Sequence, residues 1–200
     1  MKNNFVFFIF LFFFNPLLAD TLLIQSKKIS LDKDKEISIF QDEVFVRTDK
    51  NHTIESNYAE YDKKNKTVIF RDNVKLIDNK NNIITTGEAE YDEKSKIFKT
   101  KGETKIVTSE EYTIKSKNIL LNKKISSVTS DEKTIINDID GNTIQLNNFD
   151  YQKENQIFKS IGLIMVKDKF NNSYKFSQIY IDTKKKEILG SDVSALMNSN

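Results

Sequence analysis

Residues 56–85 have the sequence SNYAEYDKKNKTVIFRDNVKLIDNKNNIIT, and this stretch carries the pattern that decides the fold. Apolar side chains alternate with polar ones on both sides of the polar segment 62–66, at Ala59, Tyr61, Val68, Phe70, Val74 and Leu76. Alternation at a period of two residues indicates strands with one buried face. The Asn-, Asp- and Lys-rich segments 62–66 and 78–82 are typical of turns. The stretch therefore predicts two strands and two turns.

The same pattern recurs every 30 residues along the chain without an insertion. Three of the recurring positions are occupied by Ile29, Ala59, Ala89, Ile119, Phe149 and Ile179; by Leu31, Tyr61, Tyr91, Leu121, Tyr151 and Ile181; and by Val46, Leu76, Ile106, Ile136, Val166 and Leu196. One unit departs from the pattern, because Thr104 stands where Val44 and Val74 stand in the two units before it. A fixed period of this length is typical of stacked structural units.

The expected fold class is all-β, with about six 30-residue strand-pair repeats and roughly 10 to 13 strands of ordinary length. No helical periodicity persists after residue 19, and no linker divides the repeats. Two arrangements fit such repeats: a solenoid, or an open jelly roll of two antiparallel sheets with their apolar faces inward. The turns carry charge rather than Gly, which argues against a tight parallel β-helix.

Residues 1–19 are predicted to be a signal peptide, followed by one domain over residues 20–200. Lys2 precedes the apolar run FVFFIFLFFF at residues 5–14, and Pro16 and Ala19 fit a cleavage site before Asp20. The run is shorter than the roughly 20 residues that a transmembrane helix needs. An uncleaved signal anchor is the alternative, and both interpretations predict an exported chain.

Composition excludes several classes of protein. The chain has 200 residues and a formal charge of +2, which falls to +1 when Lys2 is removed with the signal peptide. A nearly neutral domain does not fit nucleic-acid binding. The chain has no Cys, so an exported domain must be held together by its core rather than by disulfides.

The chain resembles the OstA-like domain of the lipopolysaccharide-transport system, the domain that forms LptA and the N-terminal domain of LptD. The resemblance lies in Ala59, then Tyr61-Asp62, then the run 70–76 (FRDNVKL) and Ile84, and it extends over about residues 26–196. Asp72 stands where the family pattern has Gly, whereas Gly102 and Gly162 occupy that position in two other units. Whether the chain has the role of LptA or of a detached LptD domain stays open. An uncleaved anchor would instead resemble LptC, the membrane-anchored member of the same system, and the short apolar run and Pro16 make that the least favoured of the three roles.

The resemblance implies a slightly twisted, V-shaped β jelly roll in the periplasm, where association with the outer membrane is one expectation. Its apolar interior is expected to hold the lipid A acyl chains of lipopolysaccharide, and its edges to join other OstA-like domains by β-strand addition. The candidate groove residues are Leu31, Tyr61, Phe70, Leu76, Tyr91, Phe98, Ile106, Phe149, Tyr151, Phe158 and Val166. The candidate edge-docking residues are Leu22, Ile24, Ile29, Ile188, Val193 and Leu196. No cofactor is expected.

Simpler interpretations accompany these candidates. The inward aromatic residues are first of all a core. His52 lies in a turn without a cluster of metal ligands, so no metal site is expected. Asp32, Asp62, Asp92 and Asp182 fit turn capping better than calcium binding. The lysine runs 63–64, 123–124 and 184–186 either meet the phosphates of an acidic glycolipid or are solvated loops.

No catalytic arrangement of residues is present, so an enzyme is not expected; the adjacent acids Glu110 and Glu111 would point to opposite faces of a strand. An exported structural or adhesive β-repeat protein without a lipid ligand is the alternative function. An exported carbohydrate-active solenoid is the least favoured, because no carboxylates cluster on one face.

Overall fold

The structure is a computed structural model that describes residues 22–48, 52–185 and 187–198. All regular elements in this part of the chain are strands, and they are β1 (Leu23–Gln25), β2 (Lys28–Asp32), β3 (Ile37–Arg47), β4 (Thr53–Asp62), β5 (Thr67–Ile77), β6 (Ile83–Asp92), β7 (Ile97–Val107), β8 (Thr113–Lys117), β9 (Leu120–Asn122), β10 (Ser127–Ser130), β11 (Thr134–Asn137), β12 (Thr143–Leu146), β13 (Phe149–Gln152), β14 (Ile157–Lys167), β15 (Ser173–Asp182), β16 (Glu187–Ser191) and β17 (Ser194–Leu196). The described residues contain no helix that is long and apolar enough to cross a membrane. The expected signal peptide lies outside them.

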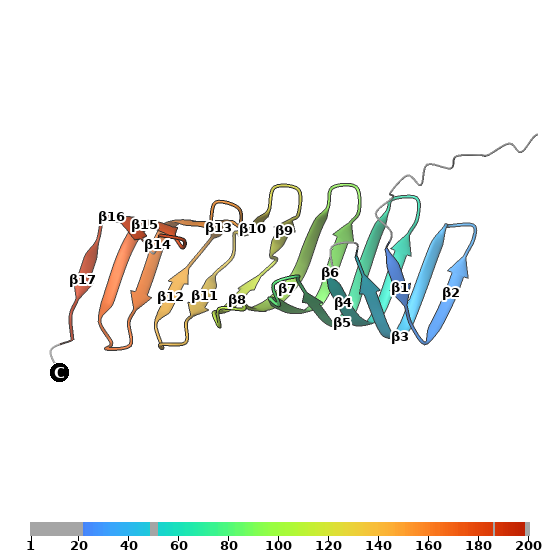
Figure 1. Cartoon of the computed structure of the whole chain (residues 1–200), viewed down its shortest axis with the longest axis horizontal. Helices are drawn as coiled ribbons and strands as arrows, with labels where there is room; N and C mark the ends of the chain where they lie inside the picture. The colour runs from blue at the N-terminus through green and yellow to red at the C-terminus, as the bar shows by residue number, and fades with distance from the viewer. Residues whose placement is uncertain (1–21, 49–51, 186, 199–200) are drawn as a thin grey trace, which may run out of the picture.

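The long strands bend in the middle, and the bend divides each one between two layers. In β5, Asp72 and Asn73 lie opposite the single residue Gly87 of β6, so the pairing shifts between Arg71 and Val74. Two residues facing one is a β-bulge, which kinks a strand and increases its twist. The halves that lead to the turns at 62–66 and its equivalents form an upper layer, and the other halves form a lower layer (Figure 1).

Left-handed backbone positions mark the repeat directly. Residues with positive φ in the upper turns lie 30 apart, at Glu36, Lys66, Lys96, Ser126 and Gln156. Those in the lower turns lie at Asn81, Glu111, Gly141 and Asn171, with the same spacing. In the bulges, Gly102 and Gly162 have φ values of 75° and 105°, at the position that Asp72 occupies with 61°. Glycine adopts this conformation without a steric penalty, which explains why it appears there.

All strand pairs are antiparallel, and neighbours in sequence lie side by side from one end of the molecule to the other (Figure 1). Within the described residues, β1 and β2 pair only with β3, while β16 and β17 pair only with β15. The fold is therefore a twisted two-layer structure with two open ends, which confirms the all-β jelly-roll prediction and excludes a solenoid of parallel strands.

The structure has 17 strands where roughly 10 to 13 were expected. The difference is one of counting, because five bent strands are interrupted at the bend and appear as pairs of short strands: β1–β2, β8–β9, β10–β11, β12–β13 and β16–β17. Counted as continuous bent strands, the elements number 12. Segment 71–73, where the alternation of apolar and polar residues is interrupted in the sequence, contains the bulge of β5 at Asp72 and Asn73.

The alignment of Leu196 with Leu76 and its equivalents is wrong. The pairing between β15 and the last two strands lacks the shift that the other bends show, and Ala195 rather than Leu196 lies opposite Tyr174. A one-residue slip turns a side chain to the other face of a sheet. The short strand β17 has no neighbour on its other side to fix its register.

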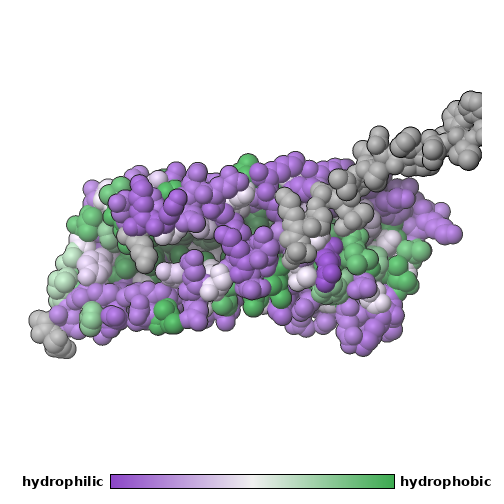
Figure 2. All heavy atoms as spheres, viewed as in Figure 1, coloured by the Kyte–Doolittle hydropathy of each residue, from purple (hydrophilic) through white to green (hydrophobic). Residues whose placement is uncertain are grey.

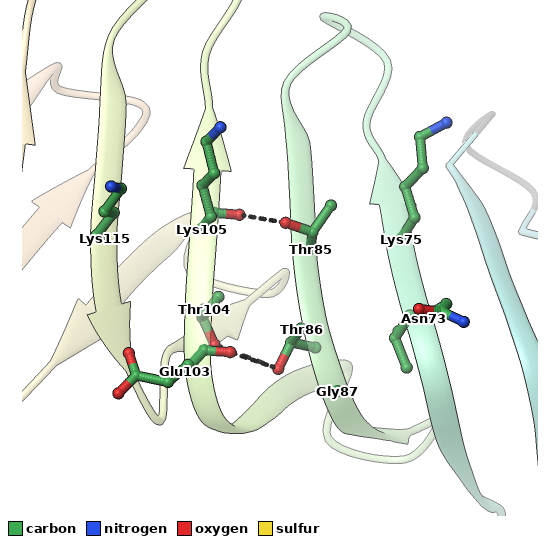
Figure 3. A pocket seen from close by; sticks show the side chains of 10 residues that line it. Asn73, Lys75, Thr85, Thr86, Gly87, Glu103, Thr104, Lys105 and Lys115 are labelled. Atoms are coloured by element: carbon green, nitrogen blue, oxygen red, sulfur yellow. Dashed lines mark hydrogen bonds between the residues drawn. The ribbon is translucent and has the colours of Figure 1, made fainter.

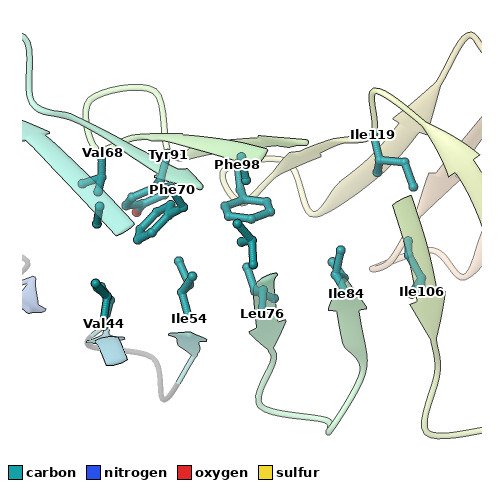
Figure 4. Close-up of a cluster of buried hydrophobic side chains, with 14 residues drawn as sticks. Val44, Ile54, Val68, Phe70, Leu76, Ile84, Tyr91, Phe98, Ile106 and Ile119 are labelled. Atoms are coloured by element: carbon teal, nitrogen blue, oxygen red, sulfur yellow. The ribbon is translucent and has the colours of Figure 1, made fainter. Parts of the chain in front are cut away.

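The core lies between the two layers, and it consists of two clusters. The first cluster extends over residues 44–119 and contains most of the buried hydrophobic side chains. Phe70 and Phe98 project from the upper layer, and Ile54 and Leu76 face them from the lower layer (Figure 4). The second cluster is smaller, and its buried members are Ile136, Leu146, Phe149, Phe158, Ile164 and Ile179. Ile114 and Val128 pack against both clusters.

The turns are held by carboxylates that accept backbone N–H groups. Asp62 Oδ1 accepts from the N–H of Asn65 at 2.8 Å, and Asp32, Asp92 and Asp182 make the same type of contact in their turns. The prediction that these aspartates cap turns is therefore confirmed. Neighbouring upper turns are also joined, since the N–H of Lys63 donates to the carbonyl oxygen of Glu36 and the pattern continues along the row.

Candidate functional site

The two layers cover each other unevenly, and this decides which inner side chains a ligand can reach. One row of inner residues runs along the lower layer, one residue per strand, from Val46 in β3 to Tyr174 in β15. Leu76 in this row is 2% exposed, Ile106 6% and Ile136 9%. Ile114 is partly exposed, and beyond Ile136 all remaining row members, Ile144, Val166 and Tyr174, are partly exposed. The interior is therefore closed in its N-terminal half and opens toward the C-terminal end.

The uncovered part of the interior is an apolar surface. We call it the open inner face, and it consists of Ile144, Tyr151, Val166, Tyr174, Phe176 and Ile181. All of them except Tyr174 pack against the second core cluster, and all six residues are partly exposed. Figure 2 shows a hollow in this half of the molecule, where hydrophobic side chains lie between two hydrophilic bands. Such a surface suits hydrocarbon, because burial of each methylene group contributes about 0.8 kcal/mol.

Tyr174 joins the open inner face to the rim of the lower layer. Its hydroxyl group donates to Asp168 Oδ2 at 3.3 Å. Desolvation raises the pKa of the Tyr174 hydroxyl, and the neighbouring Asp168 carboxylate raises it further. The phenol group therefore stays neutral at physiological pH, with its ring inside and its polar end at the rim.

An ion pair connects an upper turn with a lower turn. Lys153 Nζ, from the upper turn after β13, lies 3.1 Å from Asp78 Oδ2, in the lower turn after β5. Burial raises the pKa of the Asp78 carboxyl, but the hydrogen bonds that it accepts outweigh this effect, and the pKa lies below its ordinary value. The strongest of these bonds come from the backbone and side chain of Asn82, both at 2.9 Å.

The groove candidates chosen from the sequence lie on the inner face, but at very different depths. Phe70, Leu76, Phe98 and Ile106 are buried in the closed half. Tyr91 is also buried there, beneath the ammonium group of Lys123, which lies 5.0 Å from its ring centroid. Tyr61 packs beside that cluster and is partly exposed. In the other half, Phe149 and Phe158 are stacked with a centroid distance of 5.8 Å and form the base beneath Tyr151 and Val166.

Sequence reasoning missed Phe176 as a groove residue. The signal that would have found it is a change along the 30-residue register, where Ser56, Thr86 and Ser116 are followed by Leu146 and Phe176. Small hydroxyl residues occupy this position in the closed half, and large apolar residues occupy it in the open half.

Buried hydroxyl groups line the bends in the middle of the molecule. Thr104 Oγ1 donates to Thr100 Oγ1 at 2.8 Å, and Ser116 Oγ lies 2.7 Å from Thr134 Oγ1. Thr100 Oγ1 also accepts the N–H of Ile119 at 2.8 Å, where the bend interrupts the strand ladder. These hydroxyl groups form hydrogen bonds with backbone groups at the bends. They also place polar side chains between the two apolar clusters.

The edge candidates lie at the two ends of the structure. Ile29 and the groove candidate Leu31 are in β2, opposite the inward residues Phe40 and Ser38 of β3, and Leu31 is 61% exposed. Ile24 of β1 pairs with Val46 and, like Leu22, packs against the first cluster. At the other end, Ile188 is 60% exposed, and Val193 and Leu196 are exposed as well. At each end of the described structure, the terminal strand therefore has one edge without a pairing strand, and apolar side chains beside it are exposed.

A second concave surface lies at the bends of the middle strands, and most of the residues that line it are polar. It has a volume of about 600 Å³ and is bordered by Lys75, Lys105 and Lys115, together with threonines and Glu103 (Figure 3). Lys105 and Lys115 lie directly opposite each other on β7 and β8. This lining does not suit acyl chains. No group of three or more metal-ligating side chains occurs in the described part of the chain.

Comparison with known proteins shows that part of the chain is similar to one family. Residues 20–110 match the family model described as "LptC: Lipopolysaccharide-assembly, LptC-related". This match confirms the resemblance to lipopolysaccharide-transport proteins over that region. No match was found among curated proteins. One similar solved structure is the crystal structure of LptH, "the LptA homologous periplasmic component of the conserved lipopolysaccharide transport device" from Pseudomonas aeruginosa, with 10% identity over 90% of this chain and 96% of that chain. Its TM-score of 0.25 is too low to support a conclusion about this chain.

Proposed function

We propose, from the LptC-related match of residues 20–110, that this chain is a periplasmic component of lipopolysaccharide transport that performs no chemistry of its own. It holds acyl chains of the lipid on the open inner face and joins other domains of the same type through its end strands. The observation that carries the proposal is the uncovered apolar surface at Ile144, Val166 and Phe176, in a chain whose other half has a closed core.

The physical argument for lipid binding is the absence of directional contacts on this surface. Acyl chains gain about 0.8 kcal/mol for each methylene that they bury, and no hydrogen bond fixes them at one position. A bound chain can therefore be held strongly and still slide along the surface. The polar turns on both sides leave the head group of the lipid in solvent, close to rim lysines such as Lys185, which pairs with Asp182 at 3.5 Å.

The argument for domain joining is the pair of unlike ends. β2 and β16 each have a free side, so their backbone groups are available to a strand of a partner. Because the two ends differ, the contact is head-to-tail and does not need to close into a ring. Uncovered inner residues such as Leu31 and Ile188 would then continue the apolar interior into the next domain.

Site-specific photocrosslinking in cells tests lipid binding. A photoreactive residue is placed at Tyr151 or Phe176, with the adjacent residues Asp150 and Lys175 as controls, since neighbours in a strand face opposite sides. Lipopolysaccharide adducts are expected at the two inner positions and not at the controls. Their absence at both inner positions, in protein that is folded and exported, would favour the alternative of a structural or adhesive β-repeat protein.

A further inference from the structure

The lower turns toward the C-terminal end carry exposed apolar side chains at their tips. Ile139 is 73% exposed and Phe170 67%, so within the described chain they are the most exposed large apolar residues outside the end strands. Their turns lie next to each other, between β11 and β12 and between β14 and β15 (Figure 1). The equivalent tips in the closed half are polar, at 79–80 (Asn-Lys) and 109–110 (Ser-Glu). Neither the core nor the joining of end strands accounts for the two apolar tips.

The turn that presents Phe170 has a fully hydrogen-bonded set of backbone donors. All five N–H groups of turn 168–172 donate to an oxygen atom of the protein. Four of these bonds stay within the turn, where Asp168 Oδ1 accepts the N–H of Phe170 at 2.9 Å. The fifth joins two neighbouring lower turns, since the N–H of Lys169 donates to Asn142 Oδ1 at 2.9 Å. Because an unpaired N–H group is costly to remove from water, this turn can enter an apolar environment at little cost to its backbone.

A lysine lies between the two tips. Lys169 Nζ lies 5.5 Å from the ring centroid of Phe170 and 3.9 Å from Asp140 Oδ1, which belongs to the turn that carries Ile139. The side chain of Lys169 is 49% exposed, so its ammonium group also reaches solvent. A lysine beside apolar tips suits the headgroup layer of a membrane, because its methylene stem covers apolar surface while its ammonium group reaches lipid phosphates.

The Phe170 turn is also joined to the open inner face. Tyr174, a member of that face, donates its hydroxyl group to Asp168 Oδ2 at 3.3 Å. The same turn therefore carries an exposed phenylalanine at the rim and holds the polar end of an inner-face tyrosine. A surface in contact with Phe170 would lie directly beside the open inner face.

We propose that Ile139 and Phe170 insert into the surface of a lipid bilayer and hold the mouth of the open inner face against the membrane. The inference deepens the proposed function and rests on it for the movement of acyl chains between bilayer and inner face. The two tips are two strand spacings apart, or roughly 10 Å, with polar groups between them. A protein partner would have to pair those polar groups, whereas bilayer headgroups solvate them and leave room for single apolar side chains.

The test measures the depth of single labels in a bilayer. The chain has no Cys, so one introduced cysteine carries a fluorophore at a chosen position. Ile139→Cys and Phe170→Cys report on the tips. Ile125→Cys is the matched control on the opposite rim, since Ile125 is 59% exposed in an upper turn, and Lys80→Cys is the control at a lower tip of the closed half.

The whole chain is mixed with vesicles of phosphatidylethanolamine and phosphatidylglycerol that carry a nitroxide quencher on their acyl chains. The apolar run at residues 5–14 would bind vesicles by itself where it is retained, so the readout is quenching of each label rather than the amount of bound protein. All four labelled positions are exposed, so the variants keep the fold, which far-UV circular dichroism verifies.

We expect quenching of the labels at Ile139 and Phe170 and none at Ile125 and Lys80. In the chain labelled at Ile139, Phe170→Asp should lower the equilibrium constant for insertion, measured from the quenched fraction, about tenfold, because burial of one large apolar side chain contributes at least that factor. Ile125→Asp should leave it unchanged. Absence of quenching at both tips, or equal quenching at Ile125, would overturn the insertion of the tips.

Two further outcomes separate this inference from its alternatives. Protection of the Phe170 label from a water-soluble quencher without vesicles would assign the tips to a contact between protein chains and refute membrane insertion. The vesicles contain no lipopolysaccharide, so quenching is independent of the crosslinking at Phe176. Adducts at Phe176 without quenching at the tips would refute the docking and support acyl-chain binding, whereas quenching without adducts would support the docking and count against the proposed function.

Discussion

Truncation of two phenylalanines tests whether the interior is closed at one end and open at the other. Phe70 is completely buried between the layers, and Phe176 packs against the second cluster while staying partly exposed. Phe70→Ala should lower the free energy of unfolding by about 3–5 kcal/mol, the usual cost of emptying a close-packed site. Phe176→Ala removes contacts on one side only and leaves no enclosed cavity, so about 1–2 kcal/mol is expected.

Urea unfolding followed by circular dichroism measures both effects, and it suits a chain without Trp. With a denaturant slope of about 2 kcal/mol per molar, Phe70→Ala lowers the midpoint by about 2 M and Phe176→Ala by less than about 1 M. The two variants make the same chemical change, so each is the control of the other. Equal losses of stability would refute the division of the interior into a closed and an open half, because Phe176 would then be an ordinary core residue.

Three further predictions concern the turns and the outer surface. Lys66 has a φ of 59°, a left-handed conformation that is unfavourable for residues with a Cβ atom. Lys66→Gly should therefore raise the free energy of unfolding by about 1 kcal/mol, whereas Lys64→Gly in the same turn should not raise it. Thermal unfolding of the two variants measures the difference. Lys115→Glu places a carboxylate opposite Lys105 in place of a like charge, and it should stabilise the protein by roughly 0.2–1 kcal/mol, an effect that high salt should reduce. The pKa of Asp78 is lowered in the folded protein, so the ionised carboxylate stabilises the fold above its ordinary pKa of about 4. This contribution is lost as the pH falls through the lowered pKa. The difference in free energy of unfolding between the native protein and Asp78→Asn, measured by urea unfolding, should therefore shrink in acid.

The fold could be predicted from the sequence because its causes are local. Alternation of Val68, Phe70, Val74 and Leu76 with polar residues fixes which side chains face inward. The 30-residue register fixes where the turns come. Even the glycines at the bends are explained by local backbone conformation, as the positive φ of Gly102 shows.

The site could be predicted only in part, because its limits depend on how the two layers cross. Phe98 and Val166 are equally good groove candidates in the sequence, yet one is buried and the other partly exposed. The contact between Lys153 and Asp78 joins turns that belong to different repeats, and no local pattern marks either residue. The register of Leu196 depends on the missing neighbour of β17, which is a property of the end of the sheet rather than of the repeat.

The constant spacing of the left-handed residues gives this molecule an adjustable length. Each 30-residue unit adds one pair of bent strands, or roughly 10 Å along the axis. A unit can therefore be duplicated or deleted by one in-frame recombination event while the end strands β2 and β16 stay unchanged. The distance that such a domain spans and the partners that its ends recognise are separate traits, and selection can change the first without disturbing the second.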